Sequence, residues 1–360
     1  MGINEIIVYI VIGFLCLGGI DKLRGNKWGL GKGFTDGIMT MGPLTLSMVG
    51  IISLAPVLAS ILSPVVVPVY GLVGADPASF ANTLLALDMG GYSLATEMSQ
   101  SAEAELFAWV FLGTMMGPTL AFTIPVALGI IEKDDHPYFA KGILIGLITV
   151  PVGCLIGGMV AGLDLLMITQ NLIPTIILSL AISIGLFKYT NKMIAGFSVF
   201  AKGIQIVAIV GLIAISVETF TGVVVIPNMT PLEEGIGIVG RIAVFLAGAF
   251  PLVTFISSIM KKPLSRIGAS LGMNDVSTTG LVATLAHNIP MLSILKDMDK
   301  RGKIINVAFA VSGAFVFGSH LGFVAGVNQE IVFAMIVGKL AGGVSAVLLA
   351  IFVTRKADRN

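Results

Sequence analysis

Long apolar runs separated by short polar loops dominate the chain. A membrane-spanning helix needs about 20 mostly apolar residues. Nine runs reach this length, at 4–20, 37–62, 104–131, 142–163, 165–187, 203–226, 235–260, 304–326 and 331–353. The pattern therefore predicts an all-α polytopic membrane protein with about nine transmembrane helices.

Two further runs, 63–103 and 261–303, are apolar but repeatedly interrupted. The breaks are Pro64, Pro68, Asp76-Pro77 and Gly90-Gly91 in the first, and Pro263, Gly272, Asn274-Asp275 and Asn288-Pro290 in the second. Interrupted backbone is tolerated at membrane depth only where it is buried in protein or lines a watery cavity. We therefore expect both segments to lie inside the helix bundle.

The basic residues predict an orientation. Of the 21 Lys and Arg residues, all but Arg241 and Lys339 lie in six loops or at their edges, and basic loops favour the cytoplasm. If all six are cytoplasmic, 63–103 starts and ends outside the cell, while 261–303 starts and ends inside. We therefore expect two re-entrant hairpins of opposite entry, with the N-terminus outside and the C-terminus in the cytoplasm.

An internal similarity supports the same arrangement. "LAPVLASILSPVVVP" at 54–68 aligns with "AFPLVTFISSIMKKP" at 249–263, and "GPTLAF" at 117–122 aligns with "GSHLGF" at 318–323. Two copies that face opposite ways form the inverted-topology repeat of many secondary transporters. The expected organisation is 1–36 (first helix and basic loop), 37–163 (first repeat), 164–234 (connecting helices), 235–353 (second repeat) and 354–360 (cytoplasmic tail).

Composition excludes the soluble classes of protein. Hydrophobic residues make up 56% of the chain and charged residues 11%, with a mean hydropathy of +1.00, whereas soluble domains carry about 25% charged residues. A net charge of +1 provides no field for nucleic acid. Cys16 and Cys154 lie in apolar runs, and neither a disulfide nor a metal site is expected.

The chain also lacks the short motifs of enzymes. No GxxxxGK[ST] phosphate loop, HExxH or GxSxG occurs, so neither nucleotide hydrolysis nor intramembrane catalysis is expected, and no cofactor is implied. Transport would then run down the gradient of the solute or of a coupled ion.

Four stretches together resemble a known family. They are "GINEIIVYIVIGF", "NTLLALDMGGYSLATEM", "TLAHNIPMLSILKDMDKRGK" and "FGSHLGFVAG", spread over essentially the whole chain. The sequence resembles the ethanolamine permeases of bacterial ethanolamine-utilisation operons. The resemblance implies a bacterial cytoplasmic-membrane protein that admits ethanolamine, but it brings no set of binding residues with it.

The breaks in the two hairpins are where polar chemistry is expected. They hold Asp88, Gly90, Gly91 and Tyr92 in the first and His287 and Asn288 in the second. Ethanolammonium would need a carboxylate, an aromatic face and a neutral group for its hydroxyl. Asp88 with Tyr92, and Asn288 or His287, meet these needs, and the glycine pair allows a tight turn and close approach of a ligand.

Each of these residues also has a simpler interpretation. An intramembrane acid is a functional hypothesis by default, yet Asp88 could cap a half-helix. His287 could relay protons or be held by the backbone of the hairpin tip. His320 and its repeat counterpart Thr119 could wall the cavity or only pack.

An acidic cluster follows the first hairpin. Glu97, Gln100 and Glu103 are expected at the outer mouth, where they would concentrate cations or form an ordinary solvated loop. Lys339 lies within the last span without an evident partner.

The function predicted is alternating access at a central site between the two hairpin tips, in a protein surrounded by membrane lipid. The spans 4–20, 165–187 and 203–226 would form a scaffold or an oligomer contact, and a homo-oligomer is expected. The alternatives are a carrier of another small polar solute and a non-transporting membrane receptor or docking protein.

Overall fold

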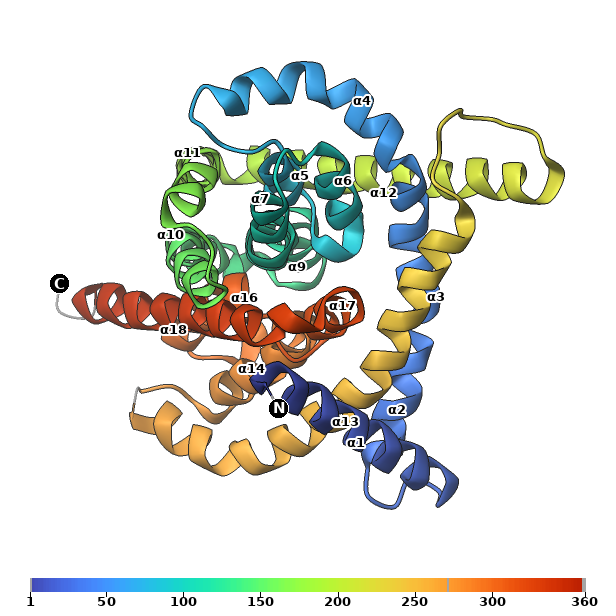
Figure 1. The fold of residues 1–360 in the computed structure, drawn as a ribbon. Helices are drawn as coiled ribbons and strands as arrows, with labels where there is room; N and C mark the ends of the chain where they lie inside the picture. The colour runs from blue at the N-terminus through green and yellow to red at the C-terminus, as the bar shows by residue number, and fades with distance from the viewer. Residues whose placement is uncertain (1, 271, 358–360) are drawn as a thin grey trace.

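The computed structural model describes residues 2–270 and 272–357, and within these ranges the chain is helical, without β-strands (Figure 1). Eight helical stretches are long and apolar enough to cross a membrane: Ile3–Leu23, Leu30–Gly71, Ala102–Ile130, Lys133–Val160, Leu165–Leu186, Ala195–Thr221, Leu232–Ile259 and Gln329–Thr354. They coincide with eight of the nine predicted spans. The side chains of Lys261, Lys262, Arg266, Arg355, Lys356 and Arg359, used above for orientation, lie outside the described part.

The long helices are α1 (Ile3–Leu23), α4 (Gly50–Gly71), α10 (His136–Val160), α11 (Leu165–Lys188), α12 (Thr190–Thr221), α13 (Leu232–Ser270) and α18 (Val332–Ala357). Residues 30–71 run through α2 (Leu30–Met39), α3 (Met41–Leu44), the π-turn η1 (Thr45–Val49) and α4. Residues 102–130 run through α7 (Ala102–Phe107), η3 (Ala108–Leu112), α8 (Gly113–Pro118), η4 (Thr119–Thr123) and α9 (Ile124–Ile130).

The short elements are α5 (Ala78–Leu84), η2 (Leu87–Met89), α6 (Gly91–Met98), η5 (Lys133–Asp135), α14 (Asp275–Ala286), α15 (Asn288–Ser293), η6 (Leu295–Asp297), α16 (Lys300–Gly313), α17 (Ser319–Val327) and η7 (Gln329–Ile331). In Figure 1 the elements α5 to α9 occupy the middle, with α10 and α11 beside them, α4 above and α16 to α18 below.

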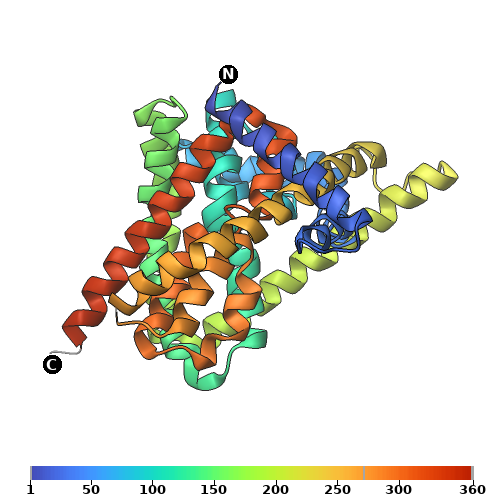
Figure 2. The same cartoon turned by 90° about the horizontal axis from the view of Figure 1, so that it is seen from below.

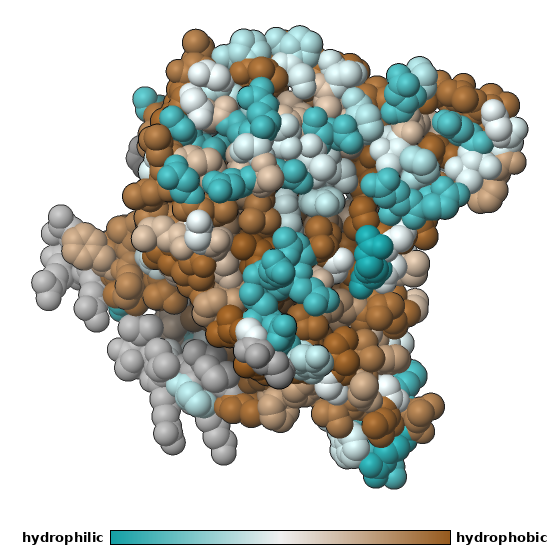
Figure 3. Space-filling view, viewed as in Figure 1, coloured by the Kyte–Doolittle hydropathy of each residue, from teal (hydrophilic) through white to brown (hydrophobic). Residues whose placement is uncertain are grey.

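Apolar side chains cover much of the outside. Ile61 on α4, Ile177 on α11, Ile206 on α12 and Phe352 on α18 are each at least 60% exposed. In Figure 3 apolar residues spread over the lower and outer parts of the view, while hydrophilic ones gather over its upper and central parts. The chain ends lie at opposite ends of the molecule in Figure 2. Such a surface suits hydrocarbon rather than water.

Glycines bring α10 and α18 into backbone contact. A Cβ at Gly338 would lie 2.9 Å from the carbonyl oxygen of Gly153 and 3.0 Å from the Cα of Gly157, and Gly342 also lies against Gly153. Small residues spaced by four allow this close approach between membrane helices, where packing replaces the hydrophobic effect. The crossing fixes one side of the bundle core.

The first interrupted segment is held together at its two ends. Asp76 accepts from the backbone N–H of Ala78 with one carboxylate oxygen and from the N–H of Gln100 with the other, both at 2.9 Å. Between these ends, Gly90 has a left-handed φ of 83° and separates η2 from α6. The break expected at Gly90-Gly91 is confirmed.

The second interrupted segment has a similar closure. The N–H of Asn274 donates to Asp299 at 2.9 Å, the hydroxyl of Ser277 donates to the same oxygen at 2.7 Å, and the other oxygen accepts from the N–H of Gly302. The helix breaks at His287, between α14 and α15, beside the expected Asn288-Pro290 break.

Two predicted boundaries are wrong. Helix α4 continues through Pro64 and Pro68 to Gly71, and α13 continues through Pro263 to Ser270, so neither segment breaks at 63 or at 261. Proline is tolerated in such helices because neighbouring groups satisfy the freed carbonyls.

The prediction of one continuous span over 304–326 is also wrong. Helix α16 ends at Gly313, and α17 begins at Ser319. The N–H groups of Phe315 and Phe317 donate instead to the carbonyls of Thr284 and Leu285, at 3.1 and 3.0 Å. The break in this helix therefore pairs with the end of α14.

We expect Gly338→Leu to destabilise the protein by about 1–3 kcal/mol, because the added side chain overpacks the contact with α10. Gly13→Leu is the matched control, since a Cβ at Gly13 meets nothing within 4 Å, and its effect should stay within about 0.5 kcal/mol. Thermal unfolding of the purified proteins measures both. Equal effects of the two changes would contradict the close crossing.

Asp299 should stabilise the fold in a pH-dependent way. Burial favours the neutral acid, but hydrogen bonds from the N–H of Asn274, from Ser277 and from the N–H of Gly302 outweigh it, so the pKa of Asp299 lies below its usual 3.8. The stabilisation is present above the unfolded-state pKa and is lost as pH falls through the lower folded-state pKa.

We therefore expect Asp299→Ala to cost about 0.5–2 kcal/mol at neutral pH, the usual cost of losing a helix N-cap. The difference from the native protein should shrink as the pH falls below the usual carboxyl pKa of 3.8. Asp297→Ala, at an exposed neighbouring acid, serves as the control. A pH-independent difference would argue against the ionised cap.

Candidate functional site

A polar cavity of about 230 Å³ lies between α6 and α13. Its walls come from α4, α6, α13 and α17 together with Thr230. They consist of Ile52, Ala55, Tyr92, Ser93, Thr96, Glu97, Thr230, Glu234, Ile238, Arg241 and Val327. Two residues predicted from the sequence, Tyr92 and Glu97, are thus brought together here.

The cavity carries charges of both signs. Glu97 and Glu234 are exposed acids, and Arg241 is an exposed base on the same helix as Glu234. Glu105 lies nearby, where its carboxylate accepts from the hydroxyls of Thr96 at 2.9 Å and Ser99 at 3.4 Å. The excess of carboxylates gives the mouth a preference for cations.

Two residues assigned to the outer mouth do not line this cavity. The N–H of Gln100 closes the first segment onto Asp76, and Glu103 is an exposed residue in the first turn of α7. Of the three vestibule residues predicted, Glu97 is the one that lines the cavity wall.

Tyr92 joins the cavity to an aromatic cluster. Its ring meets that of Trp109 at 5.3 Å and that of Phe323 at 5.6 Å, both edge to face. Trp109 is almost fully buried and Phe323 is fully buried. The tyrosine therefore has one side on the cavity and the other on the closed interior of the bundle.

Asp88 lies on the interior side of the Gly90 turn. It is a partly buried residue of η2, against which α17 packs. Ser319, the first residue of α17, lies on the helix end that packs against η2. Asp88 does not cap α6, whose N-cap is Gly90.

Lys339 is a basic residue buried in the same bundle as Asp88. It is fully buried in α18, next to the Gly338 crossing, and its Nζ donates to the carbonyl of Thr114 at 2.6 Å. Lys339 and Asp88 do not approach within 4 Å as an ion pair in the described structure. The partner of Lys339 that the sequence did not reveal is thus the backbone carbonyl of Thr114, in α8 between the π-turns η3 and η4.

The two hairpin glycines face protein rather than a cavity. A Cβ on Gly90 would collide with the Ile51 side chain of α4, and one on Gly91 would collide with Asn82 and with the carbonyl of Ala86. Their role in this structure is therefore the tight turn.

The two histidines lie on either side of one phenylalanine. The Phe315 ring centroid is 4.8 Å from that of His287 and 4.9 Å from that of His320. The Nδ1 of His287 accepts from the N–H of Ile289 at 3.1 Å, so His287 caps α15. His320 is 1% exposed, and its Nδ1 has no hydrogen-bond partner among the described residues.

Asn288 and Thr119 differ in what they leave free. Asn288 is fully buried and its Nδ2 donates to the Thr123 hydroxyl at 2.8 Å, while its Oδ1 is unpartnered within the described ranges. The Thr119 hydroxyl donates to the Met115 carbonyl at 2.8 Å, as Thr in helices commonly does. Asn288 therefore keeps its Oδ1 as an acceptor without a partner among the described residues, whereas the Thr119 hydroxyl is bonded to a carbonyl of its own helix.

Sequence reasoning missed four residues of this region. Ser319 is brought to η2 by the packing of α17 and Lys339 is placed in the interior by α18, whereas Glu234 and Arg241 reach the cavity from α13. A charged residue inside an apolar span was a usable signal for Lys339 and Arg241. For Ser319 the sequence held no signal. No group of three potential metal ligands occurs among the described residues.

Comparison with known families and proteins gives consistent matches. Residues 3–353 match the family described as "Ethanolamine utilisation protein, EutH". The chain is 60% identical to "Uncharacterized protein YxeR" of Bacillus subtilis, covering 98% of this chain and 96% of that protein. It is 59% identical to "Probable ethanolamine permease EutH" of Listeria monocytogenes (99% and 95% covered) and 43% identical to the Escherichia coli protein of the same name (99% and 97%). No solved structure matches the chain.

Proposed function

Because the chain belongs to the ethanolamine utilisation protein family EutH over nearly its whole length, we propose that it is a permease carrying ethanolamine across the bacterial cytoplasmic membrane. Relatives at 59% and 43% identity are named probable ethanolamine permeases, which confirms the resemblance found in the sequence. The names also support a transporter rather than an enzyme, and the eight apolar helices support a multi-pass membrane protein.

The observation that carries the proposal is Asp88. It is an acidic residue of η2 inside an apolar bundle, where η2 packs against α17, on the interior side of the Tyr92 cluster. A charge at such a place is costly and is retained for function. Ethanolammonium offers an ammonium for Asp88 and a hydroxyl for a neutral polar group.

The acidic cavity is the entrance in this proposal. Glu97 and Glu234 attract the cation, and the Tyr92 ring provides a cation–π surface. Ethanolamine has four heavy atoms and needs roughly four water-sized volumes, about 120 Å³, so the cavity of about 230 Å³ holds it. Movement of the Tyr92 ring away from Phe323 would open the way to Asp88 and Ser319.

Lys339 balances the empty site. The fixed cation compensates the Asp88 charge when no substrate is bound, because an isolated carboxylate at this depth is unfavourable. When ethanolammonium arrives at Asp88, the two cations compete for one carboxylate. The substrate is therefore held firmly enough to enter and loosely enough to leave.

The inner half of the path runs past the two histidines. From Ser319 the polar groups continue to His320, then across Phe315 to His287 and Asn288. The unpartnered Nδ1 of His320 and Oδ1 of Asn288 are the acceptors available to the substrate there.

We assign both interrupted segments as re-entrant hairpins. The Asp76–Gln100 and Asn274–Asp299 hydrogen bonds tie the two ends of each segment together, which supports entry and exit on the same side of the membrane. The positive loops then give opposite entry sides, an external N-terminus and a cytoplasmic C-terminus.

Two glycines support the inverted repeat. Gly117 and Gly318 are aligned in the internal similarity, and a Cβ on either would collide with the carbonyl that ends its hairpin arm, that of Leu85 or Ala286. Equivalent positions thus make equivalent contacts in the two halves. Repeats of this kind underlie alternating access.

Ion pairs on the expected cytoplasmic side would close the inner exit. Lys303 contacts the buried Asp135, and Lys296 lies 3.6 Å from Glu132, so the end of the second segment is tied to η5. In the proposed cycle these contacts separate when the site opens inward. In the present structure the inner exit is thus closed by these ion pairs, and the outer route by the packing of Tyr92 on Phe323.

The direct test is uptake of labelled ethanolamine into vesicles containing the purified protein, at acidic pH, where little neutral amine leaks through lipid. We expect saturable uptake, with kcat/KM lowered at least about thirty-fold in Asp88→Asn, because losing one partner of a buried charge pair costs about 2–5 kcal/mol. Asp36→Asn, at an exposed acid on α2, is the matched control.

Saturable uptake that survives Asp88→Asn unchanged would remove Asp88 from the site and keep the permease. Competition by unlabelled amines and nucleosides tests the substrate class. Binding without movement across the vesicle would favour a receptor instead.

Orientation is tested by cysteine labelling in a Cys16→Ser, Cys154→Ala background. We expect an impermeant thiol reagent applied to intact cells to label Ser93→Cys, in the cavity, and not Asp134→Cys, an exposed position in η5. Excess ethanolamine should slow the labelling of Ser93→Cys. External labelling of Asp134→Cys would overturn the proposed topology.

A further inference from the structure

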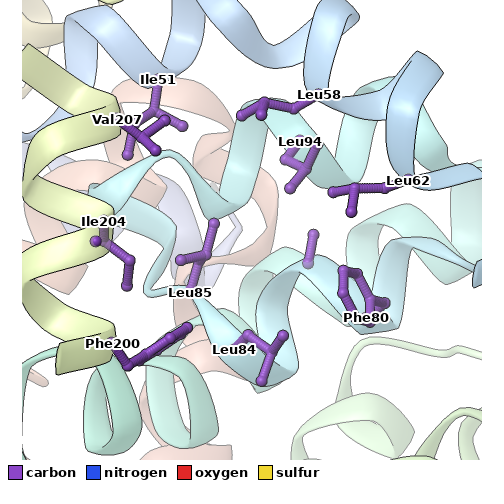
Figure 4. Close-up of a pocket in the computed structure, with 12 residues that line it drawn as sticks. Ile51, Leu58, Leu62, Phe80, Leu84, Leu85, Leu94, Phe200, Ile204 and Val207 are labelled. Carbon is purple, nitrogen blue, oxygen red and sulfur yellow. The ribbon is translucent and has the colours of Figure 1, made fainter. Parts of the chain in front are cut away.

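A second cavity, of about 310 Å³, separates α12 from the first interrupted segment (Figure 4). Its lining comes from α4, α5, α6 and α12 and consists of apolar residues, among them Leu58, Leu84, Leu94 and Ile204. In Figure 4 the side chains of Leu84, Leu85 and Phe200 project into the space between α5 and α12. The cavity thus borders the segment that carries Asp88.

The cavity lies at membrane depth. Its walls include Leu58 and Leu62 on the candidate span 30–71, and Phe200 and Val207 on the candidate span 195–221. On the same α12, Ile206 is 61% exposed on the outside of the bundle. Hydrocarbon, rather than water, therefore surrounds the region into which the cavity opens.

Protein side chains fill this gap only in part. Helix α12 packs against α4, η1, α11, α9 and η4, whereas α5 and α6 pack mainly against each other and against α4, η3 and α8. Ile204 and Ala208 of α12 belong to one apolar cluster against which Leu85 and Met89 of the segment also pack. Within the described chain, the close packing typical of protein interiors is interrupted here.

Water is a poor occupant of this cavity. A buried water needs about two to four polar partners, and the walls offer apolar side chains. An apolar cavity of about 150 Å³ already binds benzene in another protein, and this one is about twice as large. Its size and lining suit a flexible hydrocarbon chain.

We propose that an acyl chain of a membrane phospholipid occupies this cavity. The chain enters from the bilayer between α4 and α12 and fills the space beneath α5 and α6. It thereby braces the first interrupted segment against α12 in addition to the side-chain contacts of Leu85 and Met89. The site binds the hydrocarbon tail and does not select among headgroups.

The test uses vesicles of phosphatidylcholine and phosphatidylglycerol that contain a phosphatidylcholine with a photoreactive diazirine near the end of one acyl chain. After irradiation, mass spectrometry locates the labelled residues. We expect strong labelling of Phe80, Leu84 and Phe200 in the cavity, besides the general labelling of lipid-facing residues such as Ile206 and Ile213.

Two glycines of α12 provide a matched pair of variants. A Cβ on Gly203 or on Gly196 would meet nothing within 4 Å, but only Gly203 lines the cavity. Gly203→Leu should lower labelling at Phe80 and Leu84 at least about fivefold, because the added side chain and the tail cannot share the space. Gly196→Leu should leave this labelling unchanged.

Labelling at Ile206 and Ile213 should stay constant in both variants, which controls for reconstitution and folding. Cavity labelling that persists in Gly203→Leu, or that never exceeds the surface level in the native protein, would overturn the proposal. Neither result depends on ethanolamine uptake, so the lipid site and the transport function fail or stand separately.

Discussion

The backbone groups at the ends of the broken helices must find partners inside the protein, because a bilayer offers none. At the end of α5, the carbonyl of Ala86 accepts from the N–H groups of Met89 and Gly91 within the same turn. At the end of α14, the carbonyls of Thr284 and Leu285 accept from the second broken helix, between α16 and α17. These bonds allow irregular backbone, and hence polar chemistry, in the middle of the bundle.

The need to give these backbone groups hydrogen-bond partners determines how the neighbouring helices pack. Glycines at 117 and 318 let a neighbouring helix approach each terminal carbonyl, and the crossing of α10 and α18 places Lys339 in the interior beside Gly338. The acidic cavity then approaches the same centre from the α6 and α13 side. The proposed substrate site and the helix packing therefore share one set of positions.

Much of the architecture was predictable, since hydrocarbon thickness sets span length directly. The tight turn at Gly90 followed from local chemistry, as did the break beside Asn288. Prolines misled the prediction at Pro64 and Pro263, because a membrane helix tolerates a proline that would end a helix in a soluble protein. The break between α16 and α17 was missed because its hydrogen bonds go to α14, a distant segment.

The residues of the candidate site also divide into those that local sequence indicates and those that only the packing of distant segments brings together. Asp88, Tyr92 and Glu97 could be selected from their own residue types and positions in an interrupted segment. Ser319 and Lys339 could not be assigned to Asp88, because nothing local in the sequence encodes which helices cross near η2. The free acceptor on His320 likewise depends on what surrounds the ring, and only packing decides that.

Phe315 has a backbone φ of 63°, a left-handed conformation that bulky side chains rarely adopt. Holding a non-glycine residue there costs about 1–3 kcal/mol. The contacts of its ring with His287 (edge to face) and His320 (tilted), together with the bond from its N–H to the Thr284 carbonyl, maintain the conformation. The junction of α16 and α17 therefore stores backbone strain. A rearrangement that separates this junction from α14 would release the strain, which lowers the free energy needed to reach the other state of the proposed transport cycle.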